Sequence, residues 1–196
     1  MEGVSVIIGI TGGHGSGKTS FALSYASGFG REGLYLSTLH TSLPDGMPDS
    51  SRCRWQHLQA GEELPGLLHR INEESNLFRA ERRVVVVDSI TSYLAGVHAQ
   101  LWKKRPEGDN EEYDAIYIEE IVAARKRLQE ALFAFQGKLF LITNDPPAYT
   151  PFTDPKEQSY IIEHAALNRD LARRSHQWFR LEAGMPEEVS ARRFRG

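Results

Sequence analysis

The most informative stretch of this chain reads Gly12-Gly13-His14-Gly15-Ser16-Gly17-Lys18-Thr19, which matches the pattern G-x-x-x-x-G-K-[ST]. It follows a β-branched apolar run at residues 4–10, which has the length of one buried strand. It precedes residues 18–26, in which Phe21, Ala22 and Tyr25 share one helical face. The sequence therefore predicts a strand, a tight glycine-rich turn and a helix, in that order.

This order of elements is suited to binding phosphate. Glycines let the backbone curl until several N–H groups point inward, and the start of the helix adds a partial positive charge. In such a phosphate loop, Lys18 bridges the β- and γ-phosphates of a nucleotide and the Thr19 hydroxyl binds Mg²⁺. The alternative is a glycine-rich turn that matches the pattern by chance. The flanking strand and helix favour a nucleotide site formed by residues 12–19.

The rest of the chain alternates between strand patterns and amphipathic helix patterns. Strands are predicted at residues 34–38, 84–88, 138–143 and 177–181, with a short final strand after a turn at 184–186. Helices are predicted at residues 62–78, 90–102, 118–135 and 158–174, and loops at 40–56, 103–114 and 144–155. This alternation indicates a single three-layer α/β domain over residues 1–196, with a mainly parallel sheet.

The carboxyl ends of parallel strands meet at one edge of the sheet, and ligands bind outside that edge. The predicted strand ends are Gly12, Thr38, Asp88 and Asn144. Asp88 either helps to hold Mg²⁺ opposite Thr19 or caps the helix that follows, and the phosphate loop favours the metal role. Asn144 and Asp145 either hydrogen-bond a ribose, a water or the acceptor, or serve only the turn before two prolines.

The composition is that of an ordinary globular protein. The chain has 196 residues, of which 40% are hydrophobic and 25% charged, and its net charge is −3. This balance lacks the basic excess of nucleic-acid-binding domains, so no nucleic-acid partner is expected. We also expect no membrane partner, because the apolar run at residues 4–10 is far shorter than the ~20 residues of a membrane helix. A single cysteine, Cys53, cannot form an internal disulfide, which fits a cytoplasmic protein.

Several segments resemble, in order, the motifs of a known family. In the first half of the chain, residues 11–19 resemble its T-G-G-x-x-S-G-K-S opening, residues 34–38 resemble its Y-I-A-T strand, and Trp55 with residues 62–64 resembles its H-W-x-T-x-E segment. Residues 87–91 resemble its [DE]-C-x-T strand end, and residues 142–145 resemble its V-T-N-E. Near the end, residues 167–172 resemble its V-N-Q-x-[LI]-A helix and Trp178 resembles its late V-W-L strand. Together these segments span nearly the whole chain. The sequence thus resembles the bifunctional adenosylcobinamide kinase / adenosylcobinamide-phosphate guanylyltransferase family.

The resemblance implies a RecA-like P-loop NTPase fold, a homotrimer and two reactions. In the first reaction, ATP or GTP with Mg²⁺ phosphorylates the aminopropanol hydroxyl of adenosylcobinamide. In the second, GTP transfers its GMP to that phosphate through a guanylyl-histidine. The catalytic residues would then be Lys18, Asp88 and a histidine, and the metal ligands would be Thr19 and Asp88.

The sequence departs from the family where that histidine is expected. The interval between His40 and Arg54 contains no histidine at the matching place, and the family's V-G-x-G-x-V-P is replaced by Pro146-Pro147-Ala148-Tyr149-Thr150-Pro151. A neutral imidazole is a nucleophile near pH 7 that also leaves well. We therefore predict His40 as the substitute, since it lies nearer the strand edge than His57. The second hypothesis is a diverged nucleotide-binding regulator or ATPase that lacks guanylyl transfer and acts through a partner.

The remaining charged features give weaker signals. Arg54, together with Arg52, either clamps the triphosphate or is solvated. Cys53 lies between these arginines, which predicts a thiol that ionises readily. The basic run at residues 103–105 is interpreted as a solvated loop. No metal motif of histidines or cysteines is present, so Mg²⁺ bound with the nucleotide is the only metal expected.

Overall fold

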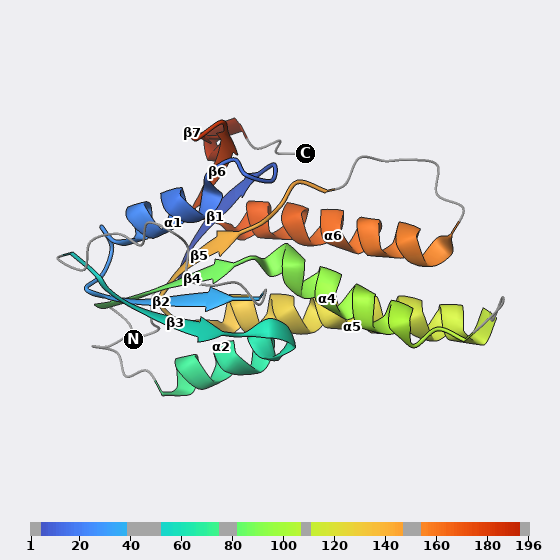
Figure 1. Cartoon of the computed structure of the whole chain (residues 1–196). Coiled ribbons are helices and arrows are strands. Elements are labelled where there is room, and N and C mark those ends of the chain that lie inside the picture. The colour runs from blue at the N-terminus through green and yellow to red at the C-terminus, as the bar shows by residue number, and fades with distance from the viewer. Residues whose placement is uncertain (1–4, 39–51, 75–81, 107–110, 147–153, 193–196) are drawn as a thin grey trace.

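Seven strands form one sheet in the order β3-β2-β4-β5-β1-β6-β7 (Figure 1). A computed structural model describes residues 5–38, 52–74, 82–106, 111–146 and 154–192. The strands are β1 (Val6–Gly12), β2 (Glu32–Ser37), β3 (Arg54–Gln59), β4 (Arg83–Asp88), β5 (Lys138–Ile142), β6 (Gln177–Glu182) and β7 (Met185–Glu188). Neighbouring strands are parallel except β6 and β7, which form an antiparallel hairpin.

Helices cover both faces of the sheet, which confirms the predicted three-layer α/β architecture. The helices are α1 (Lys18–Ala26), α2 (Leu64–Glu73), α4 (Ile90–Lys103), α5 (Glu111–Ala134) and α6 (Pro155–Arg174). Within the described ranges, α1 is the one helix on its face, where it packs against β1, β4 and β5. The other four helices cover the opposite face (Figure 1).

The central strand β4 shows why the sheet is apolar in the middle. Val84 and Val86 face the layer of α1, whereas Val85 and Val87 face the four-helix layer. All four side chains are at most 1% exposed. Because alternate side chains of a strand point to opposite faces, a strand covered on both sides has to be apolar throughout.

Two strand glycines make room for tryptophans on the neighbouring strand. Gly9 is in register with Trp178, and Gly33 is in register with Trp55. A Cβ atom on Gly9 would lie 2.0 Å from the Trp178 ring, and one on Gly33 would lie 2.4 Å from the Trp55 ring. Each indole therefore covers bare backbone, and any larger residue at either glycine would displace it.

The structure differs from the sequence prediction at two element boundaries. β3 begins at Arg54, inside the segment 40–56 for which the sequence predicts a loop, because its partly exposed, mostly polar side chains carry no apolar pattern. α5 begins at Glu111, inside the predicted loop at 103–114, where acidic residues in its first turn favour a helix start. No helix among the described residues is long and apolar enough to cross a membrane.

Candidate functional site

The phosphate loop joins the carboxyl end of β1 to the start of α1, in the middle of the sheet edge (Figure 1). Gly12 has φ +150°, and a Cβ atom there would lie 2.4 Å from the carbonyl oxygen of Leu181. Gly17, the residue before the helix, has φ +89°. Only glycine adopts these conformations without strain, so the loop geometry requires the glycines of the motif.

Ser16, within this loop, has a hydroxyl oxygen without a partner. The residue is 9% exposed, and its Oγ accepts or donates no hydrogen bond within the described part of the chain. Buried polar atoms are normally paired, so an unpaired one points to a missing ligand or water. A phosphate oxygen held by the loop would satisfy it.

The ammonium group of Lys18 is folded back onto the loop. It donates to the carbonyl oxygens of Gly12 (3.0 Å) and Gly13 (2.6 Å). Burial lowers the pKa of Lys18, and the carboxylates of Asp88 and Asp145 oppose that shift. Lys18 is thus held among loop carbonyls, and two carboxylates act on its charge, in the place where a phosphate tail needs a cation.

On one side of Lys18, two hydroxyls converge on one oxygen of Asp88. The Thr19 hydroxyl donates to Asp88 Oδ2 at 2.6 Å, and the Tyr35 hydroxyl donates to the same atom at 2.9 Å. Tyr35 is 3% exposed, and burial together with the neighbouring Asp88 raises the pKa of its hydroxyl above its ordinary range. Tyr35 therefore stays protonated and remains a donor to Asp88.

The helix that follows β4 is capped by Ser89 and not by Asp88. Ser89 Oγ accepts the backbone N–H of Ser92 at 3.1 Å, so the capping role that the sequence left open for Asp88 is already filled. A carboxylate beside a threonine hydroxyl is an oxygen donor set that suits Mg²⁺. Among the described residues, no group of three His, Cys, Asp or Glu side chains could hold a metal without a ligand's help.

Next to Asp88 at the sheet edge, Asn144 is fixed by two other segments, the start of α4 and the middle of α6. Its backbone N–H and its side-chain amide both donate to Thr91 Oγ1, at 3.0 and 3.2 Å. Its carbonyl accepts from Asn168 Nδ2 at 2.8 Å and from His164 Nε2 at 3.1 Å. Thr91, Asn144 and Asn168 belong to three motifs that lie far apart in the sequence, and the fold joins them directly.

Asp145 lies on the other side of the phosphate loop. Its Oδ1 accepts from the Thr11 hydroxyl at 3.0 Å, and its Oδ2 lies 3.7 Å from a guanidinium nitrogen of Arg180. Its backbone N–H donates to the Gly12 carbonyl at 3.4 Å, which is the same carbonyl that Lys18 contacts.

Two hollows open beside the loop. The first has a volume of about 350 Å³ and is lined by loop residues 14–20 with Asp88, Ser89, Ser92 and Asn144. The second has about 370 Å³ and is lined by residues 13–16 and 180–183 with Asp145. His14 to Ser16 line both hollows, so a ligand on the loop reaches either side.

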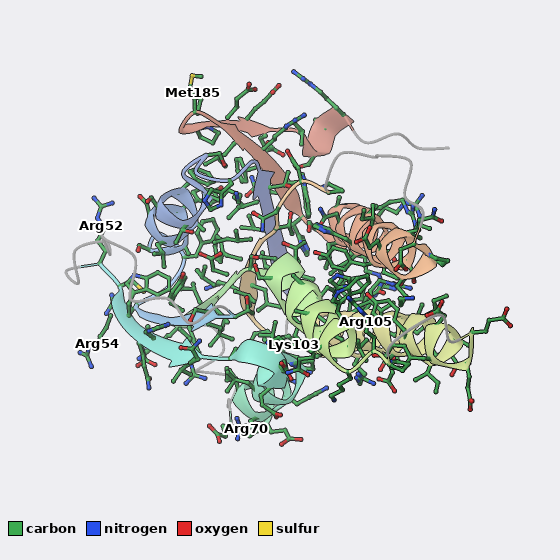
Figure 2. All side chains as sticks on the ribbon, turned by 45° about the vertical axis from the view of Figure 1, so that its right-hand side comes forward. Arg52, Arg54, Arg70, Lys103, Arg105 and Met185 are labelled. Atoms are coloured by element: carbon green, nitrogen blue, oxygen red, sulfur yellow. The ribbon has the colours of Figure 1, made fainter. Side chains whose placement is uncertain are left out.

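Other predicted site residues are not brought to this place. Arg54 is exposed at the amino end of β3, in register with Glu32, whereas the phosphate loop lies at the carboxyl ends of the strands. Figure 2 shows Arg54 and Arg52 pointing outward from that end. His40 lies outside the described residues.

One prediction about the weaker signals is wrong. Cys53 is 1% exposed, and burial with the nearby Glu32 raises the pKa of its thiol, so the flanking arginines do not favour the thiolate. The basic run is exposed, as the sequence predicts for a solvated segment, although its first residue, Lys103, ends α4. The Arg105 guanidinium lies 4.3 Å from the centre of the Trp102 ring.

Sequence reasoning assigned no role to four residues that shape the site, namely Tyr35, Thr91, His164 and Asn168. Tyr35, Thr91 and Asn168 all occur within quoted motifs, which was a signal that could have singled them out. Nothing in the sequence distinguishes His164 from any other histidine on a helix.

A family model described as "Cobinamide kinase / cobinamide phosphate guanyltransferase" matches residues 8–189 of the chain. The chain belongs to this family. The match confirms the resemblance seen in the motifs and identifies the chain as a member of an enzyme family of cobalamin biosynthesis. No curated protein matches the chain.

Among solved structures, the chain is similar to one described as "Crystal structure of the RadB recombinase". The match has a TM-score of 0.46 and 15% sequence identity, and covers 89% of this chain and 73% of that one.

Proposed function

We propose that this protein binds ATP or GTP with Mg²⁺ on the phosphate loop and transfers the γ-phosphoryl group to the aminopropanol hydroxyl of adenosylcobinamide. The observation that carries the proposal is the convergence of Lys18, Thr19 and Asp88 at the loop, in a member of the cobinamide kinase family. Loop N–H groups and Lys18 would hold the β- and γ-phosphates, while Thr19 and Asp88 would hold the metal. Bound Mg²⁺ would neutralise charge that develops on the transferred phosphoryl group.

The second activity, transfer of GMP from GTP to the phosphorylated corrinoid, is proposed from family membership, with His40 as the residue that carries the guanylyl group. By the same resemblance we propose a homotrimer, and from the single cysteine we propose a cytoplasmic location. The interval between His40 and Arg54, which lacks a histidine at the place where the family has one, favours one alternative. This alternative is a nucleotide-binding regulator or ATPase that has lost guanylyl transfer.

One experiment separates these functions. The protein is incubated with adenosylcobinamide, Mg²⁺ and either ATP or GTP, and the corrinoid is analysed by mass spectrometry for one added phosphoryl group. In parallel, α-labelled GTP tests for an acid-labile protein label that His40→Ala removes. A phosphorylated corrinoid without a protein label would mean that the protein is a kinase and not a guanylyltransferase. The absence of both the phosphorylated corrinoid and the label would favour the regulator.

A further inference from the structure

Asp145 is connected to the phosphate loop and to Lys18. Its backbone N–H and the Lys18 ammonium both donate to the Gly12 carbonyl, so Asp145 and Lys18 meet at one carbonyl of the phosphate loop. The carboxylate also opposes the burial shift in the pKa of Lys18, as does Asp88 from the other flank. Both carboxylates therefore act on the charge of Lys18, Asp88 from the first hollow and Asp145 from the second.

The two carboxylates differ in how many hydrogen bonds their side-chain oxygens accept. Asp88 Oδ2 already accepts two hydroxyl donors, one of which is the proposed metal ligand Thr19. Asp145 Oδ1 accepts one hydroxyl, from Thr11, and its Oδ2 meets Arg180 only at 3.7 Å, beyond ordinary hydrogen-bond range. The Asp145 side chain is 40% exposed, and it lines the second hollow.

The second hollow has the size and the polar groups for part of a substrate. Its volume of about 370 Å³ lies within the range of small-molecule sites. It is bounded on one side by the phosphate loop and on the other by the end of β6, so anything inside it touches the loop. In the described part of the chain, Asp145 and Glu182 are the carboxylates that line it.

We propose that the second hollow receives the alcohol end of the phosphoryl acceptor and that Asp145 is the general base for its hydroxyl. This inference rests on the proposed function. The acceptor oxygen forms a bond to the γ-phosphorus as the bond from that phosphorus to the β–γ bridging oxygen breaks. The bridging electron pair leaves with the nucleoside diphosphate, and the hydroxyl proton passes to Asp145 Oδ2. Thr11 fixes the carboxylate through Oδ1 while this happens.

The test is Asp145→Asn, which keeps the shape and the acceptor for Thr11 but cannot take a proton. The control is Glu187→Gln, the same chemical change on a carboxylate of β7 that pairs with Arg192 at 2.7 Å and lies outside both hollows. We expect the single-turnover rate of phosphoryl transfer to adenosylcobinamide to fall by at least about 100-fold in Asp145→Asn. The Kd for ATP and GTP is expected to stay within about twofold of the wild-type value, which also shows that the variant is folded.

Two results with an active wild type would overturn the inference. One is an unchanged transfer rate in Asp145→Asn. The other is a loss of nucleotide affinity, or a change in the preference between ATP and GTP, as large as the loss of rate, because the hollow would then hold the nucleoside. A wild type that phosphorylates no corrinoid refutes the proposed function separately. Asp145 is then tested on hydrolysis of the bound triphosphate, in which water is the phosphoryl acceptor. The role of Asp145 as general base is overturned if hydrolysis persists in Asp145→Asn, or if the wild type does not hydrolyse the triphosphate.

Discussion

The two flanks of the phosphate loop are built in opposite ways. On one flank, Asp88 is held by Thr19 and by the buried hydroxyl of Tyr35, at the end of a central strand. On the other flank, Asp145 follows the last residues of β5, is 40% exposed and has one short hydrogen bond through its side chain. The first carboxylate is thus held by two hydroxyl donors, as suits the metal role proposed for it, whereas the second is partly exposed, as suits the proposed exchange with a substrate.

The difference agrees with the roles proposed for the two flanks. A carboxylate that positions Mg²⁺ gains from rigidity, because the ion demands near-octahedral geometry. A carboxylate that exchanges a proton with a substrate needs a free oxygen and an open approach. Lys18 contacts the Gly12 and Gly13 carbonyls of the loop between the two flanks, and both carboxylates oppose the lowering of its pKa by burial.

Removal of the Lys18 side chain has the largest expected effect, because it removes the cation near both carboxylates. Lys18→Ala should weaken ATP and GTP binding by at least about 100-fold, or about 2.7 kcal/mol, because a buried cation between two carboxylates is lost. Isothermal titration calorimetry in Mg²⁺ measures this. Lys126→Ala, on an exposed position of α5, is the control and should bind like the wild type. Full affinity in Lys18→Ala would refute the nucleotide site itself.

Substitution of Asp88 tests the metal flank by itself. Asp88→Asn keeps an oxygen acceptor for Thr19 and Tyr35 but removes the charge that would attract Mg²⁺. We expect nucleotide affinity to fall by about tenfold in Mg²⁺ and to be unchanged when EDTA removes the metal. The Mg²⁺ dependence is read from titrations in both conditions. An equal loss with and without Mg²⁺ would mean that Asp88 supports the loop and not the ion.

Tyr35 provides a further test of the metal flank, because its hydroxyl donates to Asp88 and to no other group among the described residues. Tyr35→Phe removes one hydrogen bond to a carboxylate and should raise the Mg²⁺ concentration for half-maximal nucleotide binding by about three- to tenfold. The matched control is Tyr25→Phe, which removes a hydroxyl bonded to Gln177 at 3.0 Å, away from the loop. If both variants shift the Mg²⁺ requirement equally, Tyr35 only stabilises the fold.

The sequence is sufficient to predict the loop because everything the loop needs is local. A buried strand, glycines that permit positive φ and a helix start follow each other within twenty residues, and each leaves its own pattern. The parallel sheet is predictable for a similar reason, since β4 and β5 are covered on both faces and therefore continuously apolar. β3 leaves no such pattern because it is an edge strand with polar, half-exposed side chains.

The flanks are harder to predict because they are made by contacts between distant segments. Thr91 meets Asn144 across 53 positions, and Asn168 meets it across 24. No periodicity encodes such a contact, although family motifs mark the residues involved. Whether Asp88 caps a helix or faces Thr19 also depends on geometry alone, because either role is compatible with an aspartate at the end of a strand.

The smallest expected effect concerns the support behind Asp145. His164 is 3% exposed and donates through Nε2 to the carbonyl of Asn144, the residue before Asp145. Burial lowers the pKa of His164, although the bond to Asn144 and the charge of Asp145 oppose the shift. Since the pKa is lower in the folded chain than in the unfolded one, the contribution of neutral His164 to stability is complete above about pH 6.5 and declines as the pH falls below it.

Urea unfolding of the wild type and of His164→Gln between pH 7.5 and pH 5 tests this support. Glutamine can still donate an amide hydrogen to Asn144 but does not titrate, so the free energy of unfolding should fall less steeply with acid in the variant. The difference in slope is at most about 1.4 kcal/mol per pH unit, the value for one proton. His98 also has a pKa lowered by burial and remains in both proteins, so the variant keeps part of the acid sensitivity. Identical slopes would show that His164 makes no proton-linked contribution to stability and would refute this role of its buried, neutral ring.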